Sequence, residues 1–156
     1  LFILSEDTPR ERGRRRFLDP IYWKTGLSTT YGLVSDFEHW KRAFLWANRN
    51  ADVVFFMTNT GIRHWDEEAA EEHIREHIRV PVFCCDASMI RYCVAGRVNV
   101  DREPGEWMAG QALRILAGTK PEEIPLARNA QSRVVGNSEF AARLRFPLPP
   151  DAVLYP

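Results

Sequence analysis

The sequence has no excess of charge of either sign, since 21 Lys and Arg residues balance 21 Asp and Glu residues among 156 positions. A function that depends on binding a polyanion would therefore need a local basic patch instead of a global field. No apolar run reaches the roughly 20 residues that a membrane-spanning helix requires. With 45% hydrophobic and 27% charged residues, the composition is that of an ordinary globular domain.

The start of the chain does not have the pattern of a signal peptide. Residues 1–4 are apolar, but Ser5, Glu6 and Asp7 follow directly, with no basic region and no small-residue cleavage site. We interpret residues 1–4 as a buried strand. Because the chain opens on a strand and without a Met, we expect it to be part of a longer protein.

Cysteine is scarce, and its spacing excludes two common uses. Cys84, Cys85 and Cys93 provide neither an even number for a disulfide framework nor a C-x-x-C pair for zinc or redox chemistry. If Cys84 and Cys85 lie in a strand, their side chains point to opposite faces. We interpret all three as small core residues. Their number favours a reducing compartment without excluding an oxidising one.

Motifs for phosphate and nucleic acid are missing as well. Neither G-x-G-x-x-G nor the P-loop pattern follows any expected strand. The basic run at 10–16 is interspersed with Glu11 and followed by Asp19, and no aromatic residues alternate with its arginines. That pattern is typical of a solvated helix face. The sequence therefore predicts no nucleic-acid partner.

One motif has the spelling of an enzyme site. Residues 73–77 read H-x-x-E-H, in which two His one helical turn apart bind zinc and the Glu acts as a base. The surrounding helix carries many further Glu and Arg residues, which are typical of a solvated face, and no acidic ligand motif follows downstream. We therefore predict no metal site and no cofactor, and keep a zinc hydrolase only as a minor alternative.

The order of apolar runs predicts an α/β fold with a parallel sheet flanked by helices. Short β-branched runs alternate with amphipathic runs that begin at capping residues such as Thr8, Ser35 and Asp66. The expected strands are 1–4, 29–34, 53–57, 80–85 and 98–100, and the expected helices are 9–18, 36–48, 67–80, 104–117 and 138–144. In the helix at 104–117 we expect Met108, Ala109, Ala112, Leu113 and Leu116 to face the core.

A parallel sheet places its ligand site outside the carboxyl ends of its strands. Short polar side chains follow four of the expected strands there, and Trp65 lies in a loop beside them, where it could wall a pocket. Helix capping also accounts for Ser35, but no capping box accounts for Asn59 or Asp86, so we rank those two first. The predicted ligand-binding residues are Asp7, Ser35, Thr58, Asn59, Thr60, Trp65 and Asp86.

Several stretches together resemble one family, the substrate-binding proteins of ABC transporters, which have the class I periplasmic-binding-protein fold. The likeness extends over most of the chain from about residue 29. Its most specific piece is the helix that ends in I-L-x-G-x-x-P-x-x-I-P. The residues that carry it are Ser35–Lys41, Ala51–Val54 with Thr58 and Asn59, Val80–Phe83, Pro104–Ala109, Ile115–Pro125 and Val134–Asn137.

The resemblance implies a non-enzymatic receptor whose two α/β lobes close on a small ligand. It places Asp86 where such proteins often pair with a ligand amine or hydroxyl, and it suggests amino acids as ligands. It also implies an extracytoplasmic location and a membrane permease or a sensor kinase as partner, without a membrane-embedded segment in this chain.

The resemblance divides the chain into two parts. Residues 1–95 would form the second, ligand-binding lobe, and residues 96–156 would form a crossover and return segment that completes the first lobe. Two alternatives stay open. The chain could be an extracytoplasmic sensing domain of a membrane signalling protein, or a flavodoxin-like regulatory domain in which Glu6 and Asp7 would be the acidic pair beside a phosphorylated Asp.

Overall fold

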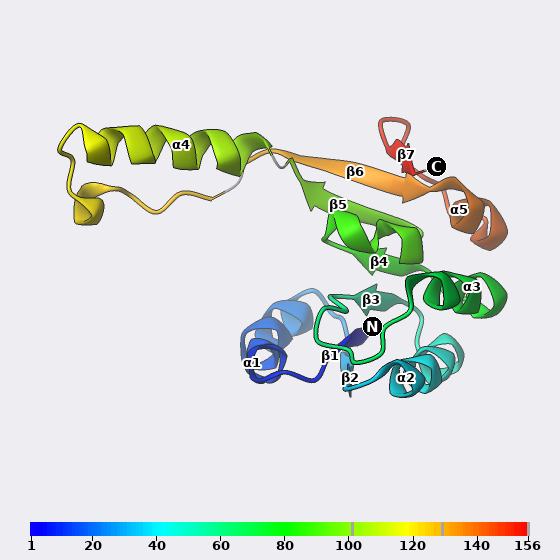
Figure 1. The fold of residues 1–156 in the computed structure, drawn as a ribbon. Helices are drawn as coiled ribbons and strands as arrows, with labels where there is room; N and C mark the ends of the chain where they lie inside the picture. The colour runs from blue at the N-terminus through cyan, green and yellow to red at the C-terminus, as the bar shows by residue number, and fades with distance from the viewer. Residues whose placement is uncertain (101, 129, 156) are drawn as a thin grey trace.

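The computed structural model describes residues 1–100, 102–128 and 130–155 (Figure 1). Its strands form one seven-stranded sheet with the order β2-β1-β3-β4-β5-β6-β7. The first five strands are mutually parallel, β6 is antiparallel to β5, and β7 is parallel to β6. The strands are β1 Phe2–Glu6, β2 Thr30–Val34, β3 Val54–Phe56, β4 Val82–Cys84, β5 Ala95–Asn99, β6 Ser132–Asn137 and β7 Val153–Tyr155. The predicted α/β class with a mainly parallel sheet is confirmed.

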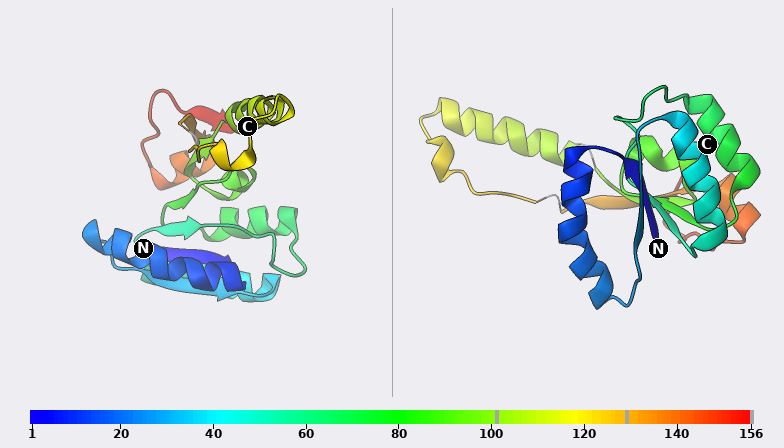
Figure 2. Two further views of the ribbon diagram at one scale, coloured as in Figure 1. Left: turned by 90° about the vertical axis from the view of Figure 1, so that its left-hand side faces the viewer. Right: turned by 90° about the horizontal axis from the view of Figure 1, so that it is seen from below.

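Helices cover both faces of this sheet, as Figure 2 shows: α1 lies on one face, and α2 and α3 lie on the other. Thr8 and Asp66 each accept a hydrogen bond from a backbone N–H in the first turn of the helix that follows, as their positions in the sequence predict. The cap of α2 was predicted at Ser35, one residue too early. Asp36 accepts from the backbone N–H of His39 instead, and the Ser35 hydroxyl donates to Asp36. The helices are α1 Pro9–Lys24, α2 Phe37–Asn50, α3 Glu67–His77, α4 Arg102–Leu116 and α5 Ser138–Leu144, with 3₁₀ turns η1 Ala87–Tyr92 and η2 Pro121–Glu123.

Helix α1 is longer than the sequence predicts. We expected it to end near Leu18, before Pro20, but it continues through Pro20 to Lys24. A proline inside a helix removes one backbone donor and crowds the preceding turn. Here Leu18 and Tyr22 are both half-buried on the same side of α1, so packing continues beyond the proline and the helix continues with it.

The core is centred on Trp40 of α2, which is fully buried. Its ring stacks on Phe44 and on Phe56 of β3, with centroids 5.5 and 5.7 Å apart. The predicted core role of Trp40 is therefore confirmed. Among the cysteines, Cys84 and Cys93 are buried whereas Cys85 is exposed.

Helix α4 forms as predicted, but its orientation was predicted wrongly. None of its described side chains is buried, and Leu113 and Leu116 are 68% and 83% exposed. The physical reason is its position. The chain leaves the sheet after β5, extends as an arm that contains α4 and η2, and returns as β6, so no sheet face lies beneath the helix (Figure 1). Glu103, at the start of α4, joins the outgoing and returning segments of this arm. Its carboxylate accepts hydrogen bonds from the backbone N–H groups of Ala130 and Gln131 at 2.8 and 2.7 Å.

The expected domain boundary at residue 95 falls at the start of β5, within the continuous sheet. β6, α5 and β7 also lie on the body, so the segment that leaves the sheet is limited to the arm between Asn99 and Ser132. None of the helices in the described parts of the chain is both long enough and apolar enough to cross a membrane.

Candidate functional site

The candidate site lies at one edge of the sheet. Because β1 to β5 are parallel, their carboxyl ends meet there, and Asp7, Ser35, Thr58 and Asp86 follow the ends of β1, β2, β3 and β4. The arm leaves from the same edge, since it begins after the carboxyl end of β5. The structure thus places the predicted polar residues along one edge, with the arm at one side of them.

The loop after β3 is held by a residue that the sequence prediction missed. The carboxylate of Glu6, at the end of β1, accepts a hydrogen bond from the backbone N–H of Gly61, and Glu6 itself is buried. A Cβ at position 61 would approach the Glu6 carboxylate oxygen to 2.9 Å, so glycine allows this close contact. Burying a carboxylate costs free energy unless it is paired. The position of Glu6 at the end of a buried strand was therefore the signal in the sequence that it has a partner.

Within this loop, the two threonine hydroxyls hydrogen-bond to each other, with Thr58 Oγ1 and Thr60 Oγ1 2.7 Å apart. The backbone carbonyl of Asn59 accepts from the N–H of Ile62 at 3.0 Å. The amide group of Asn59 is half-buried and makes no hydrogen bond to any residue in the described ranges. A loop fixed in this way presents the Asn59 amide as a ready donor and acceptor for a ligand.

Asp86 has a structural role that the sequence analysis did not assign. We argued that no capping box accounts for this residue, and the structure shows a simple N-cap without a box. Its Oδ1 atom accepts hydrogen bonds from the backbone N–H and the hydroxyl of Ser88 at 2.9 and 2.8 Å, so Asp86 is the N-cap of η1. The short 3₁₀ turn escaped the helical periodicity that reveals longer helices. The Asp86 side chain is exposed and borders a hollow of about 130 Å³ that Asn99 of β5 also lines.

Asp7 and Ser35 are both occupied within the chain. The Asp7 carboxylate forms two hydrogen bonds with the Arg12 guanidinium, at 2.6 and 2.8 Å, and this pairing lowers the pKa of Asp7. The Ser35 hydroxyl donates to the Asp36 carboxylate at 3.1 Å. These two side chains therefore lie at the site edge but are already partnered by neighbouring residues.

Trp65 packs into the aromatic core instead of standing free in the loop. Its ring lies edge-on to Trp40 and to Tyr92, with centroids 4.9 and 5.5 Å apart, and its indole N–H donates to the Tyr92 hydroxyl at 3.3 Å. Because Tyr92 belongs to η1, this contact joins the loop before α3 to the turn that Asp86 caps. Trp65 thus links the aromatic core to η1, next to the candidate site.

The H-x-x-E-H motif places its two histidines side by side on α3, with ring centroids of His73 and His77 4.4 Å apart. The Nδ1 atom of His77 lies 2.8 Å from the backbone carbonyl oxygen of His73. This nitrogen is therefore hydrogen-bonded within the helix. Within the described ranges, no cluster of three or more His, Cys, Asp or Glu side chains has an arrangement that could hold a metal ion.

Comparison with solved structures shows a shared fold. The chain superposes on CD0873, reported in its ligand-free, open form as a substrate binding protein with adhesive properties from Clostridium difficile, with a TM-score of 0.74 and 13% identity over 99% of this chain. An ABC domain in complex with L-Trp from Streptococcus pneumoniae matches with a TM-score of 0.67 and 13% identity over 98%. A conserved domain protein from Vibrio cholerae matches with a TM-score of 0.70 and 18% identity over 98%.

These likenesses establish the fold of a substrate-binding protein for this chain. The chain covers only 53% to 55% of the length of these three proteins, which is about half of each. No family model matches the sequence, and no curated protein matches it either.

Proposed function

We propose that the chain is the ligand-binding lobe and return segment of a solute-binding protein of an ABC transporter, and that it binds a small molecule without catalysis. The observation that carries this proposal is the coincidence of two features at one edge of the sheet. A polar loop fixed by Glu6 lies there, and the arm that would lead to a second lobe departs from the same edge. The shared fold supports the same assignment.

The side chains at this edge suit a small zwitterion such as an amino acid. The exposed Asp86 carboxylate offers a partner for an amine, and the Asn59 amide offers a donor for a carboxylate or an acceptor for a hydroxyl. Thr58 and Thr60 add hydroxyl groups within the same loop. Desolvation of these groups on lobe closure would strengthen each hydrogen bond.

The side chains of the arm are a second reason to propose a further lobe. Large apolar side chains are exposed along α4, and several such side chains exposed on one helix indicate a missing neighbour. In a two-lobe receptor the first lobe would cover this helix, while β6 returns the chain to the lobe described here. An extracytoplasmic location and a membrane permease as partner belong to the same proposal.

One alternative is weakened by particular contacts. A flavodoxin-like regulatory domain would use Glu6 and Asp7 as an acidic pair, but Glu6 holds Gly61 and Asp7 holds Arg12. A sensing domain of a membrane signalling protein would use the same ligand site as a transport receptor, so the site residues are tested in the same way for both.

The test is binding of single L-amino acids to the full-length protein, measured by thermal shift and by calorimetry, since a ligand bound only by the native state raises the unfolding midpoint. Asp86→Asn removes the charge but keeps an oxygen that can cap η1, and Asn59→Ala removes the amide. We expect each change to weaken binding by about tenfold or more, as loss of a charge-assisted or buried hydrogen bond does.

Asp52→Asn is the matched control, because Asp52 is exposed and precedes β3 at the opposite edge of the sheet. It should leave binding unchanged. If a ligand is found whose affinity is the same in all three variants, the site is elsewhere. If no amino acid shifts the midpoint of the wild-type protein, the proposed ligand class is wrong.

A further inference from the structure

The outward face of α1 carries large apolar side chains that nothing in the described structure covers. Phe17, Ile21 and Trp23 are 76%, 56% and 71% exposed. At 100° per residue, Phe17 and Ile21 lie within 40° of each other on the helix, whereas Trp23, in the last turn, lies 120° from Phe17. The three side chains therefore span an arc of about 160°, which is the outer half of α1. The inward half instead carries Glu11, which is buried, and Leu18, which is half-buried.

The same outer half carries positive charge and no carboxylate. Arg10, Arg16 and Lys24 are exposed there, and none of them forms an ion pair with another described residue. The two acidic residues of α1 face elsewhere. Glu11 is paired with Arg14 and accepts from the Ser5 hydroxyl, and Asp19 accepts from the hydroxyls of Tyr31 and Thr29 on the sheet side. The outer face of α1 is therefore both apolar and cationic.

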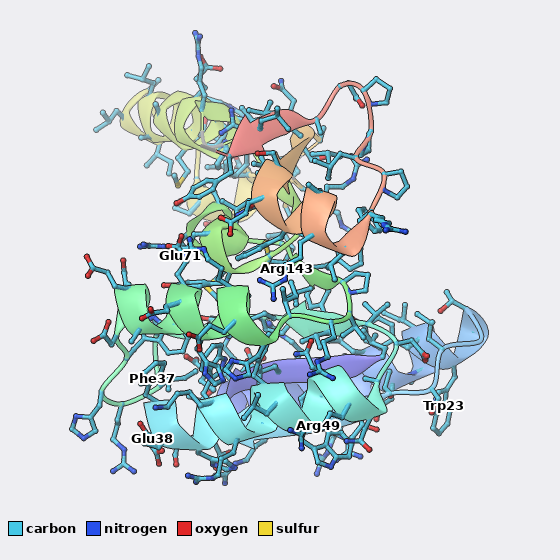
Figure 3. All side chains as sticks on the ribbon, turned by 90° about the vertical axis from the view of Figure 1, so that its right-hand side faces the viewer. Trp23, Phe37, Glu38, Arg49, Glu71 and Arg143 are labelled. Carbon is cyan, nitrogen blue, oxygen red and sulfur yellow. The ribbon has the colours of Figure 1, made fainter. Side chains whose placement is uncertain are left out.

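The position of this face separates it from the candidate ligand site. Helix α1 begins after β1 at the carboxyl edge and runs toward the opposite edge of the sheet. With a rise of about 1.5 Å per residue, Phe17 to Trp23 lie roughly 12 to 21 Å along the helix from its start. Figure 3 shows Trp23 at the far end of the molecule from Phe37 and Glu38, which follow the carboxyl end of β2. A lobe reached by the arm would not cover this end.

The sheet beside α1 is also open on the same side. The Ser5 hydroxyl contacts α1, so Ile3 and Ser5 of β1 face that helix. The strand register places Phe55 opposite Ile3 and Phe83 opposite Phe55, so both phenyl rings lie on the α1 side. They line a mostly apolar hollow of about 390 Å³ on this face. The α1 side of the sheet thus offers apolar contact beyond the helix itself.

We propose that the outer face of α1 docks on the surface of an anionic phospholipid bilayer. Phe17, Ile21 and Trp23 would enter the region between headgroups and acyl chains, where an indole is favoured because it has an apolar body and one polar N–H. The guanidinium and ammonium groups of Arg10, Arg16 and Lys24 would bind lipid phosphates around them, since long basic side chains extend their charge toward the headgroup layer. The absence of carboxylates on the described outer face is what makes an anionic surface the complementary partner.

The experiment is co-sedimentation of the 156-residue chain with vesicles of phosphatidylglycerol and phosphatidylethanolamine, compared with vesicles of phosphatidylcholine alone. We expect binding to the anionic vesicles that weakens as salt is raised, because the attraction is screened. Arg16→Glu with Lys24→Glu should lower partitioning by about tenfold or more, since each basic residue near an anionic surface contributes severalfold to binding. Phe17→Ser with Trp23→Ser should lower it as well, and brominated lipid should quench less fluorescence from a Trp23→Phe variant than from the wild type.

Arg42→Glu with Arg49→Glu is the matched control, because both arginines are exposed on α2, which covers the opposite face, and the charge change is the same. This variant should still bind. The proposal is overturned if the wild type does not bind anionic vesicles, or if the control loses binding as much as the α1 variant. It is also overturned if the apolar variant only abolishes self-association in sedimentation velocity, because the face would then contact a second copy of the chain.

Discussion

His73 is a titratable residue that the fold places against aromatic rings. Its imidazole lies 5.8 Å from the Trp40 ring and 6.0 Å from the Phe44 ring, centroid to centroid, and its buried Nε2 atom has no hydrogen-bond partner among the described residues. Burial lowers the pKa of His73 below the ordinary value of 6.5, and the nearby charge of His77 lowers it further. The folded state therefore binds this proton less tightly than the unfolded state does.

The lower pKa of His73 in the folded state predicts a loss of stability in mild acid. As pH falls through the unfolded value near 6.5, the unfolded chain takes up a proton that the folded chain resists, so the free energy of unfolding decreases. Urea unfolding at about pH 7.5 and about pH 5 should show this decrease, and His73→Leu should reduce it. His39→Gln, at an exposed histidine at the start of α2, is the control and should leave the decrease unchanged. Equal pH dependence in the wild type and His73→Leu would contradict the prediction.

Asp86 illustrates how one residue can support two interpretations. Its position after a predicted strand marked it as a ligand residue, while the structure shows one of its oxygens capping η1. The two roles are compatible, because a carboxylate has two oxygens and can accept several hydrogen bonds. For this reason Asp86→Asn is a more informative change than Asp86→Ala, which would remove the cap together with the charge.

At the scale of elements, α5 is joined to α3 by charged contacts between distant parts of the sequence. Arg75 of α3 contacts Glu139 of α5 at 2.8 Å, and the Arg143 guanidinium donates to the backbone carbonyls of Arg75 and Glu76 at the end of α3. Figure 3 shows Arg143 at this junction. Carbonyls at a helix C-terminus have no intrahelical partner, so Arg143 satisfies groups that α3 leaves open. This junction binds the last part of the chain to the body.

Helix α4 provides a prediction that also tests the two-lobe proposal. Because Leu113 and Leu116 are exposed in this chain, Leu113→Lys with Leu116→Lys should change its free energy of unfolding by less than about 0.5 kcal/mol. Phe140→Ala in the fully buried position on α5 is the contrasting control and should cost about 3–5 kcal/mol. Urea denaturation measures both.

In a longer protein with a first lobe, the same α4 variant should be destabilising by several kcal/mol, because two buried leucines would then be replaced by charges. If the α4 variant costs as little in the longer protein as in this chain, no lobe covers α4, and that part of the proposed function is wrong.

At the scale of the whole molecule, a well-packed body and an extended arm share one chain. The body has Trp40 at its centre and helices on both faces of the sheet, whereas α4 has no buried side chain among its described residues. An isolated helix of about 12–15 residues is only marginally stable in water. Local stability should therefore differ sharply between body and arm.

Hydrogen exchange followed by mass spectrometry measures this difference. We expect amides of α4, which has 15 residues, to exchange much faster than those of α2, which has 14 residues and contributes Trp40 to the core. The comparison is controlled for length, so the difference reports tertiary packing. Similar protection of both helices would mean that α4 is covered in solution, by a second copy of the chain or by an altered arm.

The local signals in the sequence were enough for the order of the first five strands and of the α-helices, the capping residues Thr8 and Asp66, the core position of Trp40 and the α/β class, but not for β6, β7 or the two 3₁₀ turns. These depend on interactions between residues close along the chain and on the spacing of apolar side chains, both of which the sequence states directly. The outcome for Trp65, by contrast, depended on Tyr92, a neighbour 27 residues away that no spacing reveals.

Only the tertiary structure decided the features that arise between distant segments. The pairing of Glu6 with Gly61 spans 55 residues, and the exposure of α4 depends on where β5 and β6 leave and rejoin the sheet. An amphipathic pattern states that a helix has an apolar face, but it does not state what lies against that face. The sequence by itself thus determined which α-helices form and which five strands precede the arm. The fold decided which side chains they bring to the ligand edge and which they leave uncovered, because burial and pairing depend on neighbours in space.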